Sequence, residues 1–399
     1  MIELDAQNQM VSKSMNLEKY SKLKGQTFIF RIGSYNNLGG AETKAITLAE
    51  ILKNDIGANV LFLANGGNGV VKQVLDDKGF KTLVFKYDLK AKPFKKAINI
   101  FRQIQFLKKY KPDFILPWSS DNCKSILPFW KLTGAKYAWW NMQDEGRGLY
   151  KTANEKKLLL SASEIVSNSL AGQMFINETY NIPKNQIKLY NNPTELPEIS
   201  KIKPVWKQRL GLSKDTLIVS MMANITRWKD HETLFKAWKL VVNHFEQKHI
   251  KIKLLLAGDC REITKELKVL GFDLNISDSV IFLGSILEVN ALILESDLIV
   301  HSSNHEGCPN AVCEAMALKK PVVGTDIPGV REALSNKYEQ YTLTSPNDGK
   351  DLAEKIIYLI QNPELSDSIA AFNRNRIAEN YTLHGMVDTL FEGFVNHLD

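Results

Sequence analysis

The chain has 399 residues, of which 44% are hydrophobic and 24% charged, a composition typical of a soluble globular protein rather than a disordered or fibrous one. This length exceeds what one hydrophobic core usually serves, so we expect two domains. Four scattered cysteines without a Cys-x-x-Cys pair argue against a disulfide framework or a cysteine zinc site, and favour a cytoplasmic location.

The first 24 residues are polar, so we expect no cleavable signal peptide, and no stretch approaches the roughly 20 apolar residues of a membrane-spanning helix. Charge is divided unevenly. Residues 1–200 hold 28 Lys and Arg against 18 Asp and Glu, whereas residues 201–399 hold 23 against 26. The positive half indicates an anionic partner, such as a phospholipid surface or a lipid-phosphate substrate. We expect no nucleic acid, because no binding motif accompanies the charge.

Short β-branched or aromatic runs alternate with helical patterns from Gln26 onward. In the first half they read QTFIFRIG, NVLFLAN, TLVFKY, DFILPWS, KYAWWNM, SEIVSNS and IKLYNN. Such alternation predicts βαβ units around a parallel sheet. Residues 192–204, NPTELPEISKIKP, contain three prolines and no apolar periodicity, which predicts a linker.

After this segment the strand pattern restarts with TLIVSMMAN, KIKLLLAG, VIFLG, DLIVHSS, PVVGTD and YTL. We therefore predict an α/β protein with two Rossmann-like, doubly wound domains facing a central cleft. They comprise residues 1–195 and 205–399, and the last helix is expected to cross back to the first domain. Ligands of such sheets lie beyond the carboxyl ends of the strands, so functional residues are expected in the loops that follow them.

The strongest motif runs from Ser302 to Leu334, SSNHEGCPNAVCEAMALKKPVVGTDIPGVREAL, with seven residues between Glu306 and Glu314. A helix is expected to begin near Pro309, which has no amide hydrogen to leave unpaired. The amides of residues 310–312 would then form a positive helix end suited to a diphosphate.

Around this helix, Gly307 lets the backbone approach a ligand closely. Glu306 is placed to accept hydrogen bonds from sugar hydroxyls, and Glu314, one turn deeper, to bind a ribose diol. The plainer alternative is a solvated glutamate pair at a helix start.

This string resembles the retaining glycosyltransferases of family 4, whose hallmark is Glu, seven residues and Glu, followed by Ala-Met-Ala and Pro-Val-Val. The resemblance extends from about Gly33 to the C-terminal helices, and Gly39–Leu52, GGAETKAITLAEIL, looks like the Gly-Gly-Ala-Glu sequence of the family. It implies a GT-B fold, in which the C-terminal domain binds a nucleotide-sugar and the N-terminal domain binds the acceptor. It also implies that Glu306 contacts the donor sugar, Glu314 the ribose, and the amides of residues 308–312 the phosphate and sugar.

A third motif, NITRWKDHETLFKAW, occupies residues 224–238 after the first strand of the second domain. Lys229 can place an ammonium against the leaving diphosphate, where negative charge grows. The family usually has an arginine five residues before this lysine, a position held here by Asn224. Either Arg227 reaches the phosphates in place of that arginine, or Lys229 is the one cation of the site. Alternatively, Lys229 and Arg227 are both ordinary solvated loop residues.

All seven histidines lie at or after His231, although many members of the family have a histidine in the N-terminal domain. WWNMQDEGRG, residues 139–148, follows a strand end there and offers Asn141, Gln143 and Asp144 toward the sugar or the acceptor. They are equally consistent with ordinary loop residues. His305 is given no role, and the cysteines near Glu306 are expected to serve in packing.

We expect no metal and no cofactor, because the chain lacks the Asp-x-Asp triplet by which another class of transferases holds its cation. The predicted catalytic residues are Glu306, Lys229 and Arg227. The predicted donor-binding residues are Gly40, Asn224, Gly258, Ser285, Ile286, Gly307, Cys308, Pro309, Asn310, Ala311, Val312 and Glu314.

The stretch from Lys90 to Lys111 holds eight Lys or Arg and no acid, with apolar residues at helical spacing. It is either a helix docking on an anionic membrane or an ordinary sheet-covering helix with a basic outer face.

The sequence thus favours a transferase that moves a hexosyl group from a nucleoside diphosphate sugar to a hydroxyl of a glycan or lipid-linked glycan. A UDP-sugar is expected as the donor in preference to a GDP-sugar. Retention is implied by the resemblance alone. Bacterial surface polysaccharide or lipopolysaccharide synthesis, at the cytoplasmic face of the membrane, is the expected setting. One rival is another enzyme on a similar scaffold, such as an epimerase or a phosphorylase. The other is a non-catalytic, nucleotide-sugar-binding subunit of another transferase.

Overall fold

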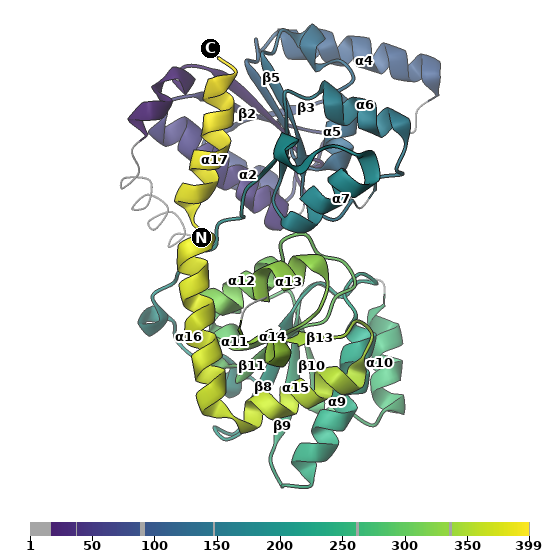
Figure 1. The fold of residues 1–399 in the computed structure, drawn as a ribbon, viewed down its shortest axis with the longest axis vertical. Helices are drawn as coiled ribbons and strands as arrows, with labels where there is room; N and C mark the ends of the chain where they lie inside the picture. The colour runs from purple at the N-terminus through teal and green to yellow at the C-terminus, as the bar shows by residue number, and fades with distance from the viewer. Residues whose placement is uncertain are drawn as a thin grey trace. The chain divides into compact units, whose positions relative to one another are not determined.

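The computed structural model describes residues 17–36, 38–87, 92–146, 148–260, 263–334 and 337–398. The first sixteen residues, on which the signal-peptide expectation falls, and residues 90 and 91 of the basic stretch lie outside the described residues. The chain divides into two compact units (Figure 1). Unit 1 comprises Met1–Pro193 with Leu383–Asp399, and unit 2 comprises Thr194–Thr382.

The described part of unit 1 contains a seven-stranded parallel sheet in the order β3-β2-β1-β4-β5-β6-β7. Its strands are β1 (Thr27–Arg31), β2 (Asn59–Ala64), β3 (Lys81–Val84), β4 (Phe114–Pro117), β5 (Tyr137–Met142), β6 (Glu164–Ser167) and β7 (Ile187–Leu189). Its α-helices are α2 (Gly40–Glu50), α3 (Val70–Asp77), α4 (Pro93–Lys108), α5 (Ser120–Ile126), α6 (Ala153–Ser161), α7 (Leu170–Tyr180) and α17 (Leu383–Asn396).

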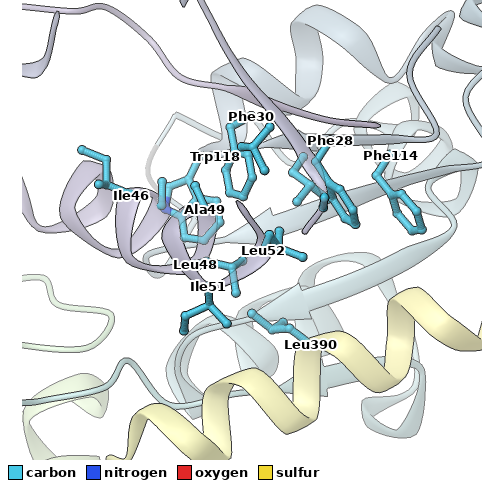
Figure 2. Packing of buried hydrophobic residues seen from close by; sticks show 14 of the residues in the cluster. Phe28, Phe30, Ile46, Leu48, Ala49, Ile51, Leu52, Phe114, Trp118 and Leu390 are labelled. Carbon is cyan, nitrogen blue, oxygen red and sulfur yellow. The ribbon is translucent and has the colours of Figure 1, made fainter. Parts of the chain in front are cut away.

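Alternation of side chains along β1 feeds two separate cores. Phe28 and Phe30 point to one face, where they pack with Trp118 and with residues of α2 and α17. Figure 2 shows this packing, with Leu390 of the C-terminal helix lying against the α2 side chains. Ile29 points to the other face, which is covered by residues of α4 to α7. Because β1 is apolar on both faces, it can occupy only the interior of a covered parallel sheet.

Unit 2 contains a six-stranded parallel sheet in the order β10-β9-β8-β11-β12-β13 within its described residues. Its strands are β8 (Leu217–Met222), β9 (Ile252–Ala257), β10 (Val280–Gly284), β11 (Leu298–His301), β12 (Val322–Thr325) and β13 (Leu343–Thr344). Its α-helices are α8 (Trp206–Arg209), α9 (His231–Glu246), α10 (Thr264–Asp273), α11 (Val289–Glu295), α12 (Asn310–Ala317), α13 (Pro328–Leu334), α14 (Glu339–Thr342), α15 (Gly349–Gln361) and α16 (Pro363–Asn380).

The prediction of two Rossmann-like, parallel-sheet domains is confirmed, and every predicted strand is present. The proline-containing segment 192–204 is not a free linker along its whole length. Its residues Leu196, Ile199 and Ile202 pack against a core cluster of unit 2, because their apolar side chains gain by leaving water. Among the described residues, none of the helices is both long and apolar enough to cross a bilayer.

Candidate active site

The strand order of unit 2 reverses between β8 and β11, which lie side by side while their chain neighbours continue to opposite sides. Ligands of open α/β sheets bind at such a switch point, beyond the carboxyl ends of the strands. Here the loop 223–230 follows β8 and the loop 302–309 follows β11. These loops carry Lys229 and Glu306.

Backbone and hydroxyl hydrogen bonds join the two loops. The carbonyl of Trp228 accepts from the amide of Asn304 at 2.9 Å and from Ser303 Oγ at 3.1 Å. Ser302 Oγ donates to the carbonyl of Asp230. Since both loops are held together at several points, the side chains that they carry have fixed positions relative to one another.

At the centre of the site, Glu306 Oε1 is contacted by two nitrogen atoms. Lys229 Nζ forms an ion pair with it, and His301 Nε2, from the end of β11, lies 2.7 Å away. A carboxylate can only accept hydrogen bonds, so His301 carries its proton on Nε2. The side chains of His301 and Glu306 are 2% and 11% exposed, which strengthens each of these interactions.

Electrostatics fix the charge state of the cluster. Burial lowers the pKa of His301, and the nearby Lys229 lowers it further, so this imidazole is neutral near pH 7. Burial alone would raise the pKa of Glu306, but the hydrogen bond from His301 and the charge of Lys229 bring that pKa well below its usual range. Glu306 is therefore an anion under working conditions, suited to accepting hydrogen bonds rather than to giving a proton.

A second buried histidine begins α9. Asp230 caps this helix, its Oδ1 accepting from the amide of Thr233 at 3.2 Å. His231 Nδ1 lies 2.9 Å from the carbonyl of Lys229, so it donates there and Nε2 is left as an acceptor. Burial lowers the pKa of His231 to about 4. Neither His231 nor His301 is among the residues predicted from the sequence, although the polar residue that ends the apolar run DLIVH was a usable signal for His301.

The helix start after Glu306 differs from the prediction in two details. Pro309 is the N-cap and α12 begins at Asn310, so proline does not hold the first helical position. The amide of Val312 donates to the carbonyl of Pro309 at 3.0 Å, which removes Val312 from the predicted set of unpaired amides. The amides of Asn310 and Ala311 have no hydrogen-bond partner among the described residues and remain suited to an anion.

Gly329, the second residue of α13, supports the Glu306 loop from beneath. A Cβ at this position would lie 2.0 Å from the carbonyl oxygen of Gly307 and 2.4 Å from that of Glu306. Only glycine permits this approach of two backbones. Its importance was missed, because nothing in the sequence indicates which backbone it faces.

Other predicted residues of unit 2 lie on the loops after β8 and β9. Arg227 Nη2 is 3.3 Å from Glu266 on α10, and both side chains are exposed. Asn224 Oδ1 accepts from the amide of Asp259 at 2.9 Å, while a Cβ on Gly258 would meet the carbonyl oxygen of Ala223 at 2.1 Å. Asn224 and Gly258 thus hold the loops after β8 and β9 together.

Three further predicted residues of unit 2 differ in exposure. Ser285 and Glu314 are exposed, and Ile286 is half-buried against the core. Cys308 is half-buried and packs against the same cluster.

The predicted residues of unit 1 form local structure. Asn141 is fully buried, and its Oδ1 accepts from Gln143 Nε2 at 2.6 Å and from the hydroxyl of Tyr190 at 3.0 Å. Asp144 Oδ1 accepts from the amide of Gly146 at 2.9 Å. Gly40 is the first residue of α2, whose N-cap amide at Gly39 donates to Glu42 Oε2 at 3.2 Å.

Two parallel-sheet Rossmann-like units of this topology define the GT-B fold of glycosyltransferases. Solved structures agree. HepE of Anabaena in complex with UDP and glucose superposes with a TM-score of 0.78 at 19% identity, covering 93% of this chain and 100% of the other. A glycosyltransferase of Rickettsia africae gives a TM-score of 0.78 at 22% identity, covering 94% and 99%.

Sequence comparison gives the same class. Residues 202–376 match the profile of the family Glycosyl transferases group 1. An uncharacterized glycosyltransferase of Haemophilus influenzae is 26% identical over 369 residues, which cover 90% of this chain and 97% of that one. An uncharacterized glycosyltransferase of Methanocaldococcus jannaschii is 26% identical over 260 residues, covering 61% of this chain and 63% of its own length. Together these comparisons support a GT-B glycosyltransferase.

Proposed function

We propose that this protein is a retaining glycosyltransferase of family 4 that moves a hexosyl group from a UDP-sugar to a hydroxyl of a glycan or lipid-linked glycan. The observation that carries the proposal is the cluster of Lys229, Glu306 and His301 at the switch point of unit 2, directly before the N-terminus of α12. A cation, an anion and unpaired amides meet there, as a diphosphate sugar requires.

In this proposal the diphosphate binds at the amides of Asn310 and Ala311, close to the Lys229 ammonium. As the bond between the anomeric carbon and the phosphate oxygen breaks, negative charge grows on the diphosphate, and Lys229 stabilises it. The ionised Glu306 accepts hydrogen bonds from hydroxyls of the donor sugar, and Glu314 binds the ribose. Charge neutralisation by lysine and amides makes a metal ion unnecessary, so we propose metal-independent transfer.

Relatives support the choice of donor and acceptor class. HepE is described with UDP and with UDP-glucose. An N,N'-diacetylbacillosaminyl-diphospho-undecaprenol α-1,3-N-acetylgalactosaminyltransferase of Campylobacter jejuni is 25% identical over 339 residues, covering 77% of this chain and 86% of that one. By analogy we propose a lipid-linked or surface glycan as the acceptor of this chain.

Helix α4 supports a location at the membrane. Ile104 and Leu107 bury their side chains in the core, whereas Phe94 and Phe101 are 78% and 63% exposed. They stand among basic residues of the stretch that contains no acid. Apolar rings surrounded by lysines favour an anionic bilayer surface, so we propose peripheral contact at the cytoplasmic face.

Donor binding and hydrolysis test the proposal directly. Thermal stabilisation would be measured with UDP-, GDP-, ADP- and CMP-sugars, with and without EDTA, and a ligand at 100 times its Kd adds about 2.7 kcal/mol. We expect one nucleotide to respond, indifferent to EDTA, with a weaker response in Glu314→Ala. Slow donor hydrolysis without acceptor should be lost in Glu306→Gln. Binding without any hydrolysis or transfer would instead indicate a non-catalytic subunit.

A further inference from the structure

Arg31, the last residue of β1, is a buried cation with no counter-ion among the described residues. The residue is 1% exposed. Its Nη2 donates to Asn65 Oδ1 at 2.5 Å and Nη1 lies 3.5 Å from the carbonyl of Leu63, but Nε has no partner. Among the described residues no carboxylate pairs with it. Buried guanidinium groups are ordinarily paired with acids, because removing an isolated charge from water is costly.

Burial lowers the pKa of Arg31 only to about 10, so the group stays charged at neutral pH. Its position is also informative. The strand order of unit 1 reverses between β1 and β4, and Arg31 stands at the carboxyl end of β1. This switch point is where a ligand of unit 1 is expected, and the matching point of unit 2 holds Lys229 and Glu306.

Among the described residues, the atoms that accept hydrogen bonds from Arg31 are neutral oxygens. Asn65, just beyond the end of β2, uses one neutral oxygen to accept both from Arg31 and from the amide of Tyr87 at 3.1 Å. The hydroxyl of Tyr87 is buried and has no hydrogen-bond partner in the described part of the chain, and burial raises the pKa of Tyr87, which keeps the hydroxyl protonated. The Asn65 carboxamide oxygen therefore occupies a position at the Arg31 guanidinium where a carboxylate or phosphate oxygen would both neutralise the charge and accept from the N–H groups.

We propose that Arg31, Asn65 and Tyr87 form a subsite for an oxyanion, carboxylate or phosphate, carried by the sugar acceptor. The assignment to the acceptor rests on the proposed function, in which the donor binds to unit 2. The oxyanion replaces the Asn65 oxygen at the guanidinium. Asn65 is only half-buried and begins a glycine turn in which Gly66 and Gly67 have φ of 140° and 110°.

Thermal shifts with small probes test the subsite. Glucose 6-phosphate and glucuronate supply the two oxyanions, and methyl glucoside is the neutral control. We expect one or both anions to raise the Tm of the wild type and to cause no shift in Arg31→Met. The shift should be weaker in Arg31→Lys, which keeps the charge but loses the planar guanidinium that can donate two parallel hydrogen bonds. Lys53→Met is the matched control, since Lys53 is another cation of unit 1 and donates to the neutral carbonyls of Lys78 and Gly79. It should keep the wild-type shift.

A purely structural arginine predicts the opposite pattern. Because the subsite carries an unpaired charge for its ligand, Arg31→Met should leave the unliganded Tm unchanged or raise it. A lower Tm in Arg31→Met, with anion shifts absent from the wild type or preserved in the variant, would overturn the proposal. If Arg31→Met fails to fold, the Nε resonance of Arg31 in arginine-labelled wild type should move on titration with the responding anion, and an unmoved resonance counts against the subsite.

The donor site serves as an internal reference. An anion shift that survives in Arg31→Met but disappears in Lys229→Met places the anion in unit 2 and overturns the subsite. A UDP-sugar shift in the wild type without any anion shift overturns the subsite alone. An anion shift that depends on Arg31, without any response to nucleotide-sugars, supports the subsite and contradicts the proposed function.

Discussion

His301 Nε2 lies 2.7 Å from the same Glu306 oxygen that Lys229 contacts. The histidine ends a strand, whereas the glutamate and the lysine are on loops, so the rigid partner is the imidazole. A strand-borne donor can fix the direction of a loop carboxylate without touching substrate itself. His301 is accordingly a positioning residue for Glu306.

Replacing His301 tests this role. His301→Leu removes a hydrogen bond to a charged group, worth about 1.5–3 kcal/mol, and should lower kcat/KM of transfer roughly 10- to 100-fold. His301→Gln retains a donor and should recover part of the loss. Circular dichroism controls for folding. Wild-type rates in His301→Leu would show that the contact has no part in catalysis.

The buried histidines predict an acid-sensitive unit 2. The pKa of His231 is lowered to about 4, so when the pH falls below about 6.5 the unfolded chain binds a proton that the folded chain refuses. The contribution of His231 to stability is constant above pH 7, and it declines by up to about 3 kcal/mol between pH 6.5 and 4. His301, whose pKa is also lowered, adds to the same decline.

His231→Asn is the informative variant, because an amide nitrogen can still donate to the carbonyl of Lys229. Urea unfolding at pH 8 and at pH 5 should show a smaller pH dependence in this variant than in the wild type. An equal change of the unfolding free energy between pH 8 and pH 5 in both proteins would mean that His231 does not contribute to the acid sensitivity.

The fold could be predicted because each strand carries its own apolar run, and alternation of runs with helices dictates parallel sheets. The loop positions of Glu306 and Lys229 could be predicted because both residues follow strand ends. Contacts between segments far apart in the chain could not. The pairing of Arg227 with Glu266 depends on which way a loop turns, and Tyr190 meets Asn141 across 49 residues. Arg31 was passed over because a charged residue at the end of an apolar run looks like a strand terminus.

Gly329 should tolerate no side chain. The Cβ of Gly329→Ala would meet two backbone oxygens at 2.0 and 2.4 Å, so the Glu306 loop must shift. We expect a loss of about 1–3 kcal/mol in stability and at least tenfold weaker UDP-sugar binding by calorimetry. Gly271→Ala is the control, since its nearest neighbour, a ring atom of Phe235, lies at an ordinary 3.4 Å. Equal behaviour of the two variants would contradict the close contact.

Substitutions of Lys229 and of Arg227 should have very different effects on donor turnover. Lys229→Met removes the cation that contacts Glu306 and should lower donor turnover by 100-fold or more, about 2.7 kcal/mol of transition-state stabilisation. Arg227→Met breaks only an exposed pair with Glu266, so an effect below about threefold is expected. A large loss of donor turnover in Arg227→Met would indicate that Arg227 leaves Glu266 and acts in place of the family arginine, whose position Asn224 occupies in this chain.

The exposed rings of α4 should decide membrane contact. Phe94 and Phe101 are 78% and 63% exposed on a helix that also carries lysines, and burying each ring in a bilayer interface removes apolar surface from water. Phe94→Ser with Phe101→Ser should therefore abolish co-sedimentation with phosphatidylglycerol vesicles, and 0.5 M salt should weaken it in the wild type. Leu132→Ser is the control, because Leu132 is 61% exposed in the same unit but outside α4. Undiminished sedimentation of the double variant would place the membrane contact elsewhere, and no sedimentation of the wild type would remove it from the proposal.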